Sequence, residues 1–422
     1  MADGYVDLGY SPAESDLVCL FYIEPASGLS LEEAAVHVTA ESSIGTWTDI
    51  CTMKESIWRK LKPSVFGIDE STGLVKVAYP LELFELGSVP QFMSSVTGNI
   101  YGMKAIENLR FMDMTLPKRY VKSFPGPEHG IKGIRKLLGV KDRPLVGTII
   151  KPKVGLPSAE HAKVAYEAWV GGCDIVKDDE NLTDQPFNRF DKRVKLTLAA
   201  LRKAEKETGE RKVYMANVTA ETNEMVRRMK YVKKNGGTYM MVDVLTVGPA
   251  ALQTLREANP GLVIHAHRAM HAALTRNKKH GITMLALSKL YRLIGMDQLH
   301  IGTAVGKMEG PAQEVISIRD EIVSNEVSAT GERLQQRWYG MKSVFPVSSG
   351  GLHPGHVPPL MEIMGRDVII QLGGGVHGHP KGTRAGATAA RQAVDAVMEG
   401  KTLAEHAKTH AELARALEKW AK

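Results

Sequence analysis

One stretch decides the fold: LVGTIIKPKVGLPSAEHAKVAYEAWVGGCDIVKDDEN, residues 145–181. Its ends, LVGTII (145–150) and DIVKD (174–178), are short apolar runs typical of buried strands. Between them, AEHAKVAYEAWV (159–170) carries apolar residues at the three-to-four spacing of a helix. A strand, a helix and a second strand in this order predict parallel strands joined by a crossover helix.

The same alternation continues through the rest of the chain, with helices such as NEMVRRMKYVKK (223–234). Six more strands are predicted: VYMANV (213–218), YMMVDV (239–244), VIHAH (263–267), QLHIGT (298–303), VFPVSS (344–349) and VIIQLG (368–373). Eight such units favour an α/β protein with a (β/α)8 TIM barrel over an open doubly wound sheet. We place the barrel at residues 126–422, with extra loop material after the sixth and seventh strands and a polar amphipathic helix at 402–422 on its exterior.

Residues 1–125 do not alternate in this way and predict a smaller N-terminal α+β domain. It would contain a strand at 16–25, a helix at 30–42 and a strand at 75–84. The chain of 422 residues is long enough for both domains.

Charge and composition bound the class of function. A net charge of +7 could indicate nucleic-acid binding, but Lys and Arg are scattered among acids without a long basic run. We favour an enzyme that draws a polyanionic small substrate into a cleft, and expect no nucleic acid. We also expect no membrane span, because no run of ~18 or more apolar residues occurs, and no secretory signal, because the opening MADGYVDLGYSP has neither a positive region nor an apolar one. Cys19, Cys51 and Cys173 lack the spacing of a zinc or disulfide framework, which favours a reducing cytoplasm.

Active sites of such barrels lie at the carboxyl ends of the strands. Here those ends carry ionisable residues or glycines in nearly every unit, which indicates an enzyme. They are Lys151-Pro152-Lys153, Lys177-Asp178-Asp179-Glu180, His265-Ala266-His267-Arg268, His300-Ile301-Gly302-Thr303, Ser349-Gly350-Gly351 and Gly373-Gly374-Gly375.

The second strand end predicts a metal site. Lys177 and Asp179 share a strand face, and Glu180 follows where the strand ends. Carboxylates suit Mg²⁺, but a lysine ammonium would repel it unless the nitrogen were neutral or converted to an anion. The alternative is an exposed cluster of charges.

The remaining motifs suggest anion binding and a lid. Glycine clusters after strands 7 and 8 suit a phosphate, although they could simply be tight turns. GTAVGKMEG (302–310) is not a P-loop, because its glycine spacing is wrong and Met308 replaces the Ser or Thr; a flexible loop carrying Lys307 suits a closing lid. His267 and His271 lack the glutamate of a zinc motif, so zinc is improbable. With Arg268 the histidines indicate acid–base and phosphate-binding groups, although a lone one could be an ordinary buried histidine.

Together these motifs closely resemble the large chain of ribulose-1,5-bisphosphate carboxylase/oxygenase (Rubisco), over essentially the whole chain. The matching segments are AESSIGTWT (40–48), TGNIYGMKA (97–105), KPKVGL (151–156), GGCDIVKDDEN (171–181), HAHRAMHA (265–272), HIGTAVGKMEG (300–310), SSGG (348–351) and QLGGG (371–375). The shorter ends are similar to those of the archaeal (form III) branch, which acts in nucleoside monophosphate (AMP) salvage. The resemblance implies a ferredoxin-like N-terminal domain.

The resemblance also implies an activated lysine. Lys177 would react with a non-substrate CO₂ to give a carbamate, which ligates Mg²⁺ with Asp179 and Glu180. The carbamate would be the base for the substrate's C3 proton. Lys151 would protonate the product carbanion with support from Lys153, and His267 would be the acid–base group for hydration and cleavage.

Other site residues are implied by position. Lys307 would orient CO₂ and pair with Glu41 when its loop closes, and Asn99 would position the new carboxyl group. The two phosphate sites would use the following residues: Arg268 and His300 with Ser349 nearby, and Gly350, Gly351, Gly373 and Gly374 with Thr46 and Trp47.

The implied substrates are ribulose 1,5-bisphosphate and CO₂, with O₂ in a side reaction. The implied assembly is a homodimer with shared active sites, possibly built into larger rings, without a small subunit. Ile149 stands where many relatives have threonine, with Thr148 beside it, and the plant-type C-terminal latch is missing. The alternatives are a Rubisco-like enolase or isomerase acting on a sulfur-containing sugar phosphate, and a non-enzymatic scaffold that would have lost Lys177 or its acids.

Overall fold

The computed structural model describes residues 4–46, 48, 50–306 and 312–420, which pack into two compact units. The first unit comprises Met1–Gly126, Met270–Ile294 and Ser324–Met341. The second comprises Pro127–Ala269, Gly295–Val323 and Lys342–Lys422. Two segments from the second half of the chain therefore belong to the first unit, and the domain boundary between 125 and 126 stays a prediction.

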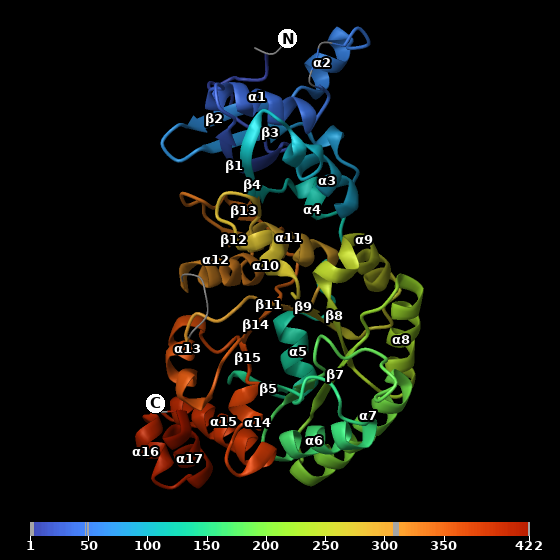
Figure 1. The fold of residues 1–422 in the computed structure, drawn as a ribbon, viewed down its shortest axis with the longest axis vertical. Helices are drawn as coiled ribbons and strands as arrows, with labels where there is room; N and C mark the ends of the chain where they lie inside the picture. The colour runs from blue at the N-terminus through green and yellow to red at the C-terminus, as the bar shows by residue number, and fades with distance from the viewer. Residues whose placement is uncertain (1–3, 47, 49, 307–311, 421–422) are drawn as a thin grey trace. The chain divides into compact units, whose positions relative to one another are not determined.

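The second unit is a closed eight-stranded parallel barrel, as predicted (Figure 1). All eight predicted strands are present, and their order around the barrel is β11-β14-β15-β5-β6-β7-β8-β9. Their bounds are β5 Leu145–Ile149, β6 Ile175–Lys177, β7 Val213–Asn217, β8 Tyr239–Asp243, β9 Val263–His267, β11 Gln298–His300, β14 Phe345–Ser349 and β15 Ile369–Gln371. Strands covered on both faces must be apolar on both, which is why they read as continuous apolar runs.

Helices alternate with these strands along the chain. They are α6 Ser158–Val170, α7 Phe190–Thr208, α8 Thr222–Lys234, α9 Val244–Glu257, α12 Ala312–Val323, α13 Val357–Met364 and α15 Gly382–Met398, with the short α14 Gly374–His377 before α15. The helices predicted at 159–170 and 223–234 correspond to α6 and α8.

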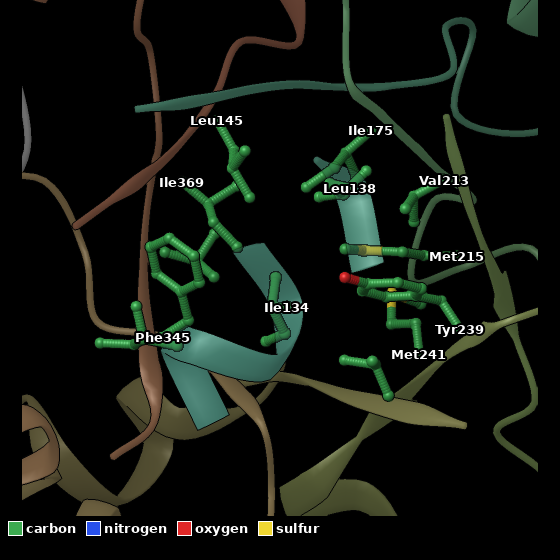
Figure 2. Close-up of a cluster of buried hydrophobic side chains, with 13 residues drawn as sticks. Ile134, Leu138, Leu145, Ile175, Val213, Met215, Tyr239, Met241, Phe345 and Ile369 are labelled. Atoms are coloured by element: carbon green, nitrogen blue, oxygen red, sulfur yellow. The ribbon is translucent and has the colours of Figure 1, made fainter. Parts of the chain in front are cut away.

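A separate helix, α5 (Gly130–Leu138), closes the amino end of the barrel. Its Ile131, Ile134 and Leu138 pack in one cluster with the first residue of seven barrel strands, including Leu145 and Phe345 (Figure 2). The apolar core therefore fills the amino end, and polar chemistry is left to the carboxyl end.

The predicted single helix at 402–422 is wrong: the structure has two, α16 (Leu403–Ala407) and α17 (Ala411–Trp420). Between them, Nδ1 of His410 lies 2.8 Å from the carbonyl oxygen of His406. This side-chain bond replaces the backbone bond that a continuous helix would make at that carbonyl. Helix α17 packs against α15, on the outside of the barrel.

The first unit is built on a five-stranded sheet of order β10-β4-β1-β3-β2. Four strands are antiparallel neighbours: β1 (Leu17–Pro25), β2 (Ser64–Asp69), β3 (Leu74–Tyr79) and β4 (Ile106–Thr115); β10 (Gly281–Ile282) adds parallel to β4. The predicted strand at 75–84 ends early, at Tyr79, because Pro80 cannot donate to a strand ladder and a 3₁₀ turn, Leu81–Leu83, follows. Helix α1 (Leu31–Glu41), predicted at 30–42, starts with a capping box between Ser30 and Glu33.

A buried ion pair joins the separate chain segments of this unit. Lys289 of α11 (Met284–Ile294) lies 2.7 Å from Asp113 of β4, and both side chains are fully buried. The other oxygen of Asp113 accepts a 2.7 Å hydrogen bond from the backbone N–H of Leu334. One carboxylate thus holds three stretches of chain together.

We expect Lys289→Met to destabilise the protein by about 3–5 kcal/mol, because it leaves Asp113 buried without its cation. A matched control is Lys279→Met in the same inserted segment, where the pair with Glu24 is exposed and contributes about 0–1 kcal/mol. Urea unfolding of the full chain measures both. Equal midpoint shifts in the two variants would contradict the role given to the buried pair.

Candidate active site

Lys177 ends β6 and its side chain is completely buried. Its Nζ donates to the carbonyl oxygen of Asp178 (2.8 Å) and contacts Sδ of Met241 (3.1 Å). The carboxylate of Glu180 is 3.6 Å away. Burial lowers the pKa of Lys177, and nearby acids offset only part of that effect. A larger share of the Lys177 amine is therefore neutral at a given pH than for an exposed lysine.

Two lysines from the end of β5 face the acids at the end of β6. Lys151 Nζ lies 2.8 Å from Oδ2 of Asp179, and Lys153 Nζ lies 3.9 Å from Oε1 of Glu180. Burial opposes ionisation of Glu180, but nearby positive charge, chiefly that of Lys177, outweighs it and lowers the pKa of that carboxyl to about 2. Glu180 is therefore an anion at neutral pH.

Asp178 points to the other side of the strand and has a structural role. It accepts hydrogen bonds from Arg193 Nε (3.0 Å), Tyr214 OH (2.8 Å) and the backbone N–H of Asn217 (3.0 Å). Nε2 of His161 lies 3.0 Å from it. Asp178 thus ties β6 to α6, α7 and β7.

The donor set fits Mg²⁺ only with a converted lysine. Across the described part of the chain, no three His, Cys, Asp or Glu side chains come together as a metal site. Asp179 and Glu180 supply two carboxylates, and Lys177 beside them would supply the third anionic oxygen donor as a carbamate. The residues present therefore fit the predicted magnesium site, which stays a prediction.

The end of β9 places His267 against these acids. Its Nδ1 lies 2.7 Å from Oδ1 of Asp243, and its Nε2 lies 3.6 Å from Oε2 of Glu180. A carboxylate only accepts, so Nδ1 carries the proton and Nε2 of the neutral ring is a free base. Burial, with the charge of Lys177, lowers the pKa of His267.

His300, at the end of β11, stacks edge-on against His267 with 4.8 Å between ring centroids. Burial lowers the pKa of Arg268 to about 10, which leaves the guanidinium charged at neutral pH. Gly302 has a φ of 100°, and a Cβ there would lie 2.7 Å from Nη2 of Arg268. Only glycine lets the guanidinium approach this strand end so closely.

The glycine clusters lie at the ends of the next two strands. Ser349 ends β14, and Gly350 and Gly351 follow with φ of 124° and 65°. Gly373 follows β15, where a Cβ would lie 3.3 Å from Cε of Lys151, and Gly374 begins α14. The predicted residues of strands 1, 2, 5, 6, 7 and 8 thus all stand at the carboxyl end of one barrel.

Ile149 is buried, and the hydroxyl of Thr148 is already used. Thr148 Oγ1 donates to the carbonyl oxygen of Leu372 (2.7 Å) and lies 3.0 Å from Nε2 of His377. Neighbouring strand residues point to opposite faces, so Thr148 does not replace a hydroxyl at position 149.

The remaining predicted residues lie in the first unit or outside the described residues. Within the first unit, Nδ2 of Asn99 donates to Oε1 of Glu41 at 3.4 Å, and Thr46 is half-buried. Trp47 and Lys307 lie outside the described residues.

Sequence reasoning missed Asp243, Asn217 and Gln298. Asn217 ends β7 and donates from Nδ2 to the backbone oxygen of Glu180 at 3.0 Å, and Asp243 ends β8. Their position at the ends of strands 3 and 4 was the available signal, since the same rule found the other strand ends. Gln298 begins β11 and carried no such signal.

Comparison with known proteins assigns the family. Residues 130–420 match the profile of the ribulose bisphosphate carboxylase large chain, catalytic domain, and residues 4–120 match that of its N-terminal domain. The ribulose bisphosphate carboxylase of Methanosarcina mazei is 56% identical, covering 100% of both chains, and that of Methanocaldococcus jannaschii is 54% identical, covering 99% of both.

Solved structures agree with the sequence relatives. The dimeric archaeal Rubisco of Hyperthermus butylicus has a TM-score of 0.93 at 48% identity, covering 99% of this chain and 98% of its own. The octameric Rubisco of Pyrococcus horikoshii, in complex with sulfate ion, has a TM-score of 0.93 at 48% identity, covering 99% and 96%. Within the described residues, no helix has the length and apolar character to cross a membrane.

The protein is thus an enzyme of the TIM-barrel class, a carbon–carbon lyase. The chain belongs to the ribulose bisphosphate carboxylase large chain family.

The buried histidines predict an acid-sensitive fold. Burial is the main cause that lowers the pKa of His265, His267 and His300, so the unfolded chain binds more protons than the folded one below pH ~6.5. The free energy of unfolding should therefore fall as pH drops from about 7.5 to about 5.5, by up to ~1.4 kcal/mol per histidine per pH unit. We expect His265→Gln to lose less stability over this range than wild type in urea unfolding without metal. An unchanged pH slope would contradict the assignment.

Proposed function

We propose that this chain is a ribulose-1,5-bisphosphate carboxylase that enolises its substrate, adds CO₂ and cleaves the product to two 3-phosphoglycerates, with Mg²⁺. The observation that carries the proposal is Lys177: a fully buried amine beside Asp179 and Glu180, at a strand end shared with Lys151 and His267. Burial makes Lys177 costly as a cation even with Glu180 3.6 Å away, and a carbamate at this position would give Mg²⁺ a third anionic oxygen ligand whose charge the metal compensates.

Carbamate formation follows from the environment of Lys177. The neutral amine attacks CO₂, a nitrogen–carbon bond forms, and one proton leaves to solvent. The lowered pKa of Lys177 increases the share of neutral amine at neutral pH. The carbamate, Asp179 and Glu180 would hold Mg²⁺, which when bound acts as a Lewis acid on the oxygens of the sugar.

Other residues would move protons. The carbamate takes the C3 proton of the sugar. His267 takes a proton from the attacking water at Nε2, because Asp243 holds its Nδ1 proton and steadies the ring. Lys151, with Lys153 beside it, returns a proton to the carbanion left by cleavage. Lys307, from its loop, would orient CO₂ and stabilise the new carboxylate.

The two phosphates would bind at two separate sites at the carboxyl end of the barrel. Arg268 and His300, with Ser349, would hold one, and Gly350, Gly351, Gly373 and Gly374 would hold the other with backbone N–H groups. Thr46 and Trp47 would complete the second site, and Glu41 and Asn99 would pair with Lys307 and the nascent carboxyl group. We propose that these last four come from a partner chain, in a homodimer that larger rings could contain, without a small subunit.

The wider role rests on the archaeal resemblance. We propose a cytoplasmic enzyme of AMP salvage in which O₂ competes with CO₂ for the same electron-rich carbon. The runner-up, a Rubisco-like enolase, would exchange the C3 proton of the substrate with solvent without ever forming phosphoglycerate. Incubation with labelled bicarbonate, Mg²⁺ and ribulose bisphosphate, followed by product identification, separates the two.

Lys177→Ala and Lys177→Arg should each lose carboxylation at least about a hundredfold, because neither side chain forms a carbamate. Wild type should gain activity on preincubation with CO₂ and Mg²⁺, and the variants should not. A matched control is Lys212→Arg, at a buried lysine paired with Glu210 outside the site, which should stay activatable. Full activity in Lys177→Ala would rule out the carbamate.

Sharing of sites between chains has its own test. Lys177→Ala and Asn99→Ala should each be inactive alone, but a mixture should recover part of the activity, because some sites in the mixed dimers carry neither change. Subunit exchange is verified with differently tagged chains. If exchange occurs and no activity returns, each site is built within one chain.

A further inference from the structure

A hydrogen-bonded chain of three buried side chains leads to the proposed phosphate site. Gln298 and His300 stand two residues apart on β11 and share a face, and His265 is the strand partner of Gln298 on β9. Oε1 of Gln298 lies 2.8 Å from Nδ1 of His265, whose Nε2 lies 2.9 Å from Nε2 of His300. The proposed reaction uses neither Gln298 nor His265.

The direction of these hydrogen bonds determines which nitrogen of His300 carries the proton. A neutral imidazole has one donor and one acceptor nitrogen. The amide oxygen of Gln298 only accepts, so His265 carries its proton on Nδ1 and accepts at Nε2. His300 then carries its proton on Nε2. Its Nδ1 is left as a lone pair, which cannot donate to an anion.

His300 stays neutral at ordinary pH. Burial, and then the groups that face it, His267, His265, Lys177 and Arg268, lower its pKa well below the usual value. A neutral His300 therefore binds a phosphate oxygen only if Nδ1 carries the proton. For that to happen, the donor and the acceptor must exchange roles in both hydrogen bonds, between Gln298 and His265 and between His265 and His300.

The amide of Gln298 can reverse the chain. Its Nε2 is buried and has no hydrogen-bond partner among the residues that the structure describes. Rotating the amide by half a turn places Nε2 against His265 Nδ1 as a donor. His265 then carries its proton on Nε2, and His300 carries its own on Nδ1. Each ring keeps one proton, so the net charge does not change.

We propose that Gln298 is a positioning residue: its amide sets, through His265, which nitrogen of His300 carries the proton, and its rotation lets neutral His300 donate to a phosphate group. This inference rests on the proposed function, which assigns that phosphate to His300. It explains why an amide, which both donates and accepts, occupies a position where a carboxylate would only accept.

Sulfate is the probe, because it stays a dianion across the neutral range and the related Pyrococcus horikoshii structure is a sulfate complex. Binding of labelled sulfate to the full chain is measured by equilibrium dialysis between about pH 6.5 and about pH 9 at fixed ionic strength. The variants are Gln298→Glu, Gln298→Met and Gln371→Glu. Gln371 is a matched control, a buried glutamine on β15 whose amide has no partner among the described residues.

We expect wild type and Gln298→Met to bind sulfate with little change across this range. In Gln298→Met, His265 is free to carry its proton on Nε2. In Gln298→Glu the ionised carboxylate cannot donate, so binding must take up one proton, on the introduced carboxylate, on His265 or on His300. Its affinity should therefore fall about tenfold per pH unit as pH rises. Adding His300→Ala to Gln298→Glu should remove that slope.

Three results would overturn the inference: no added slope in Gln298→Glu, the same slope in Gln371→Glu, or a slope that survives His300→Ala. Nitrogen-15 spectra of the wild-type histidine rings give a second test that needs no folded variant, since the protonated nitrogen of His300 should change from Nε2 to Nδ1 when sulfate binds. No change would also overturn it. Carboxylation by wild type is measured separately, so a negative result for the role of Gln298 does not contradict the proposed function. If His300→Ala alone binds sulfate like wild type, the phosphate assignment itself falls.

Discussion

The active site depends on keeping one amine, Lys177, fully buried beside an acid that lies 3.6 Å away. Burial is costly for the lysine cation, and the nearby carboxylates offset only part of that cost. Here the atoms in direct contact are a carbonyl oxygen and a thioether sulfur, and the acid that follows stands 3.6 Å away. The surrounding polar groups are arranged so that the amine is held in place while remaining reactive.

That arrangement is supported from the opposite face of the same strand. Asp178 has partners on two helices and the next strand, which fixes the backbone on either side of it. Lys177 and Asp179 are its immediate neighbours in the chain, so the contacts of Asp178 on one face of the strand also hold the backbone of the site residues on the other face. Inside the barrel, the amino end is apolar and closed by α5, whereas the carboxyl end holds the charged groups. Stability and chemistry thus occupy different ends of the same strands.

Sequence patterns predicted the barrel well because its signals are local. Each buried strand is an apolar run, and each strand end names residues that the closed sheet must bring together, such as Lys151 and Asp179. The patterns failed where distant chain segments decide the outcome. No local sequence pattern shows that β10 joins the sheet of the first unit or that Asp113 forms an ion pair with Lys289. Side-chain partners were also hidden: the pleat places Asp179 on the face of Lys177 and Asp178 on the other, but no local pattern shows that Asp178 binds Arg193 and Tyr214.

The first unit combines an N-terminal segment with two later segments of the chain, so it cannot be completed until the later segments have been synthesised. In sequence, 175 positions separate Met114 from Lys289, whose Nζ donates to its carbonyl oxygen. A ribosome adding ~5–20 residues per second needs on the order of ten to forty seconds to cover that distance. Through that interval β4 is already made but lacks its neighbour β10 and its covering helix α11. The nascent chain therefore carries an unfinished sheet edge past the exit tunnel, and the time before closure is set by translation speed as much as by folding.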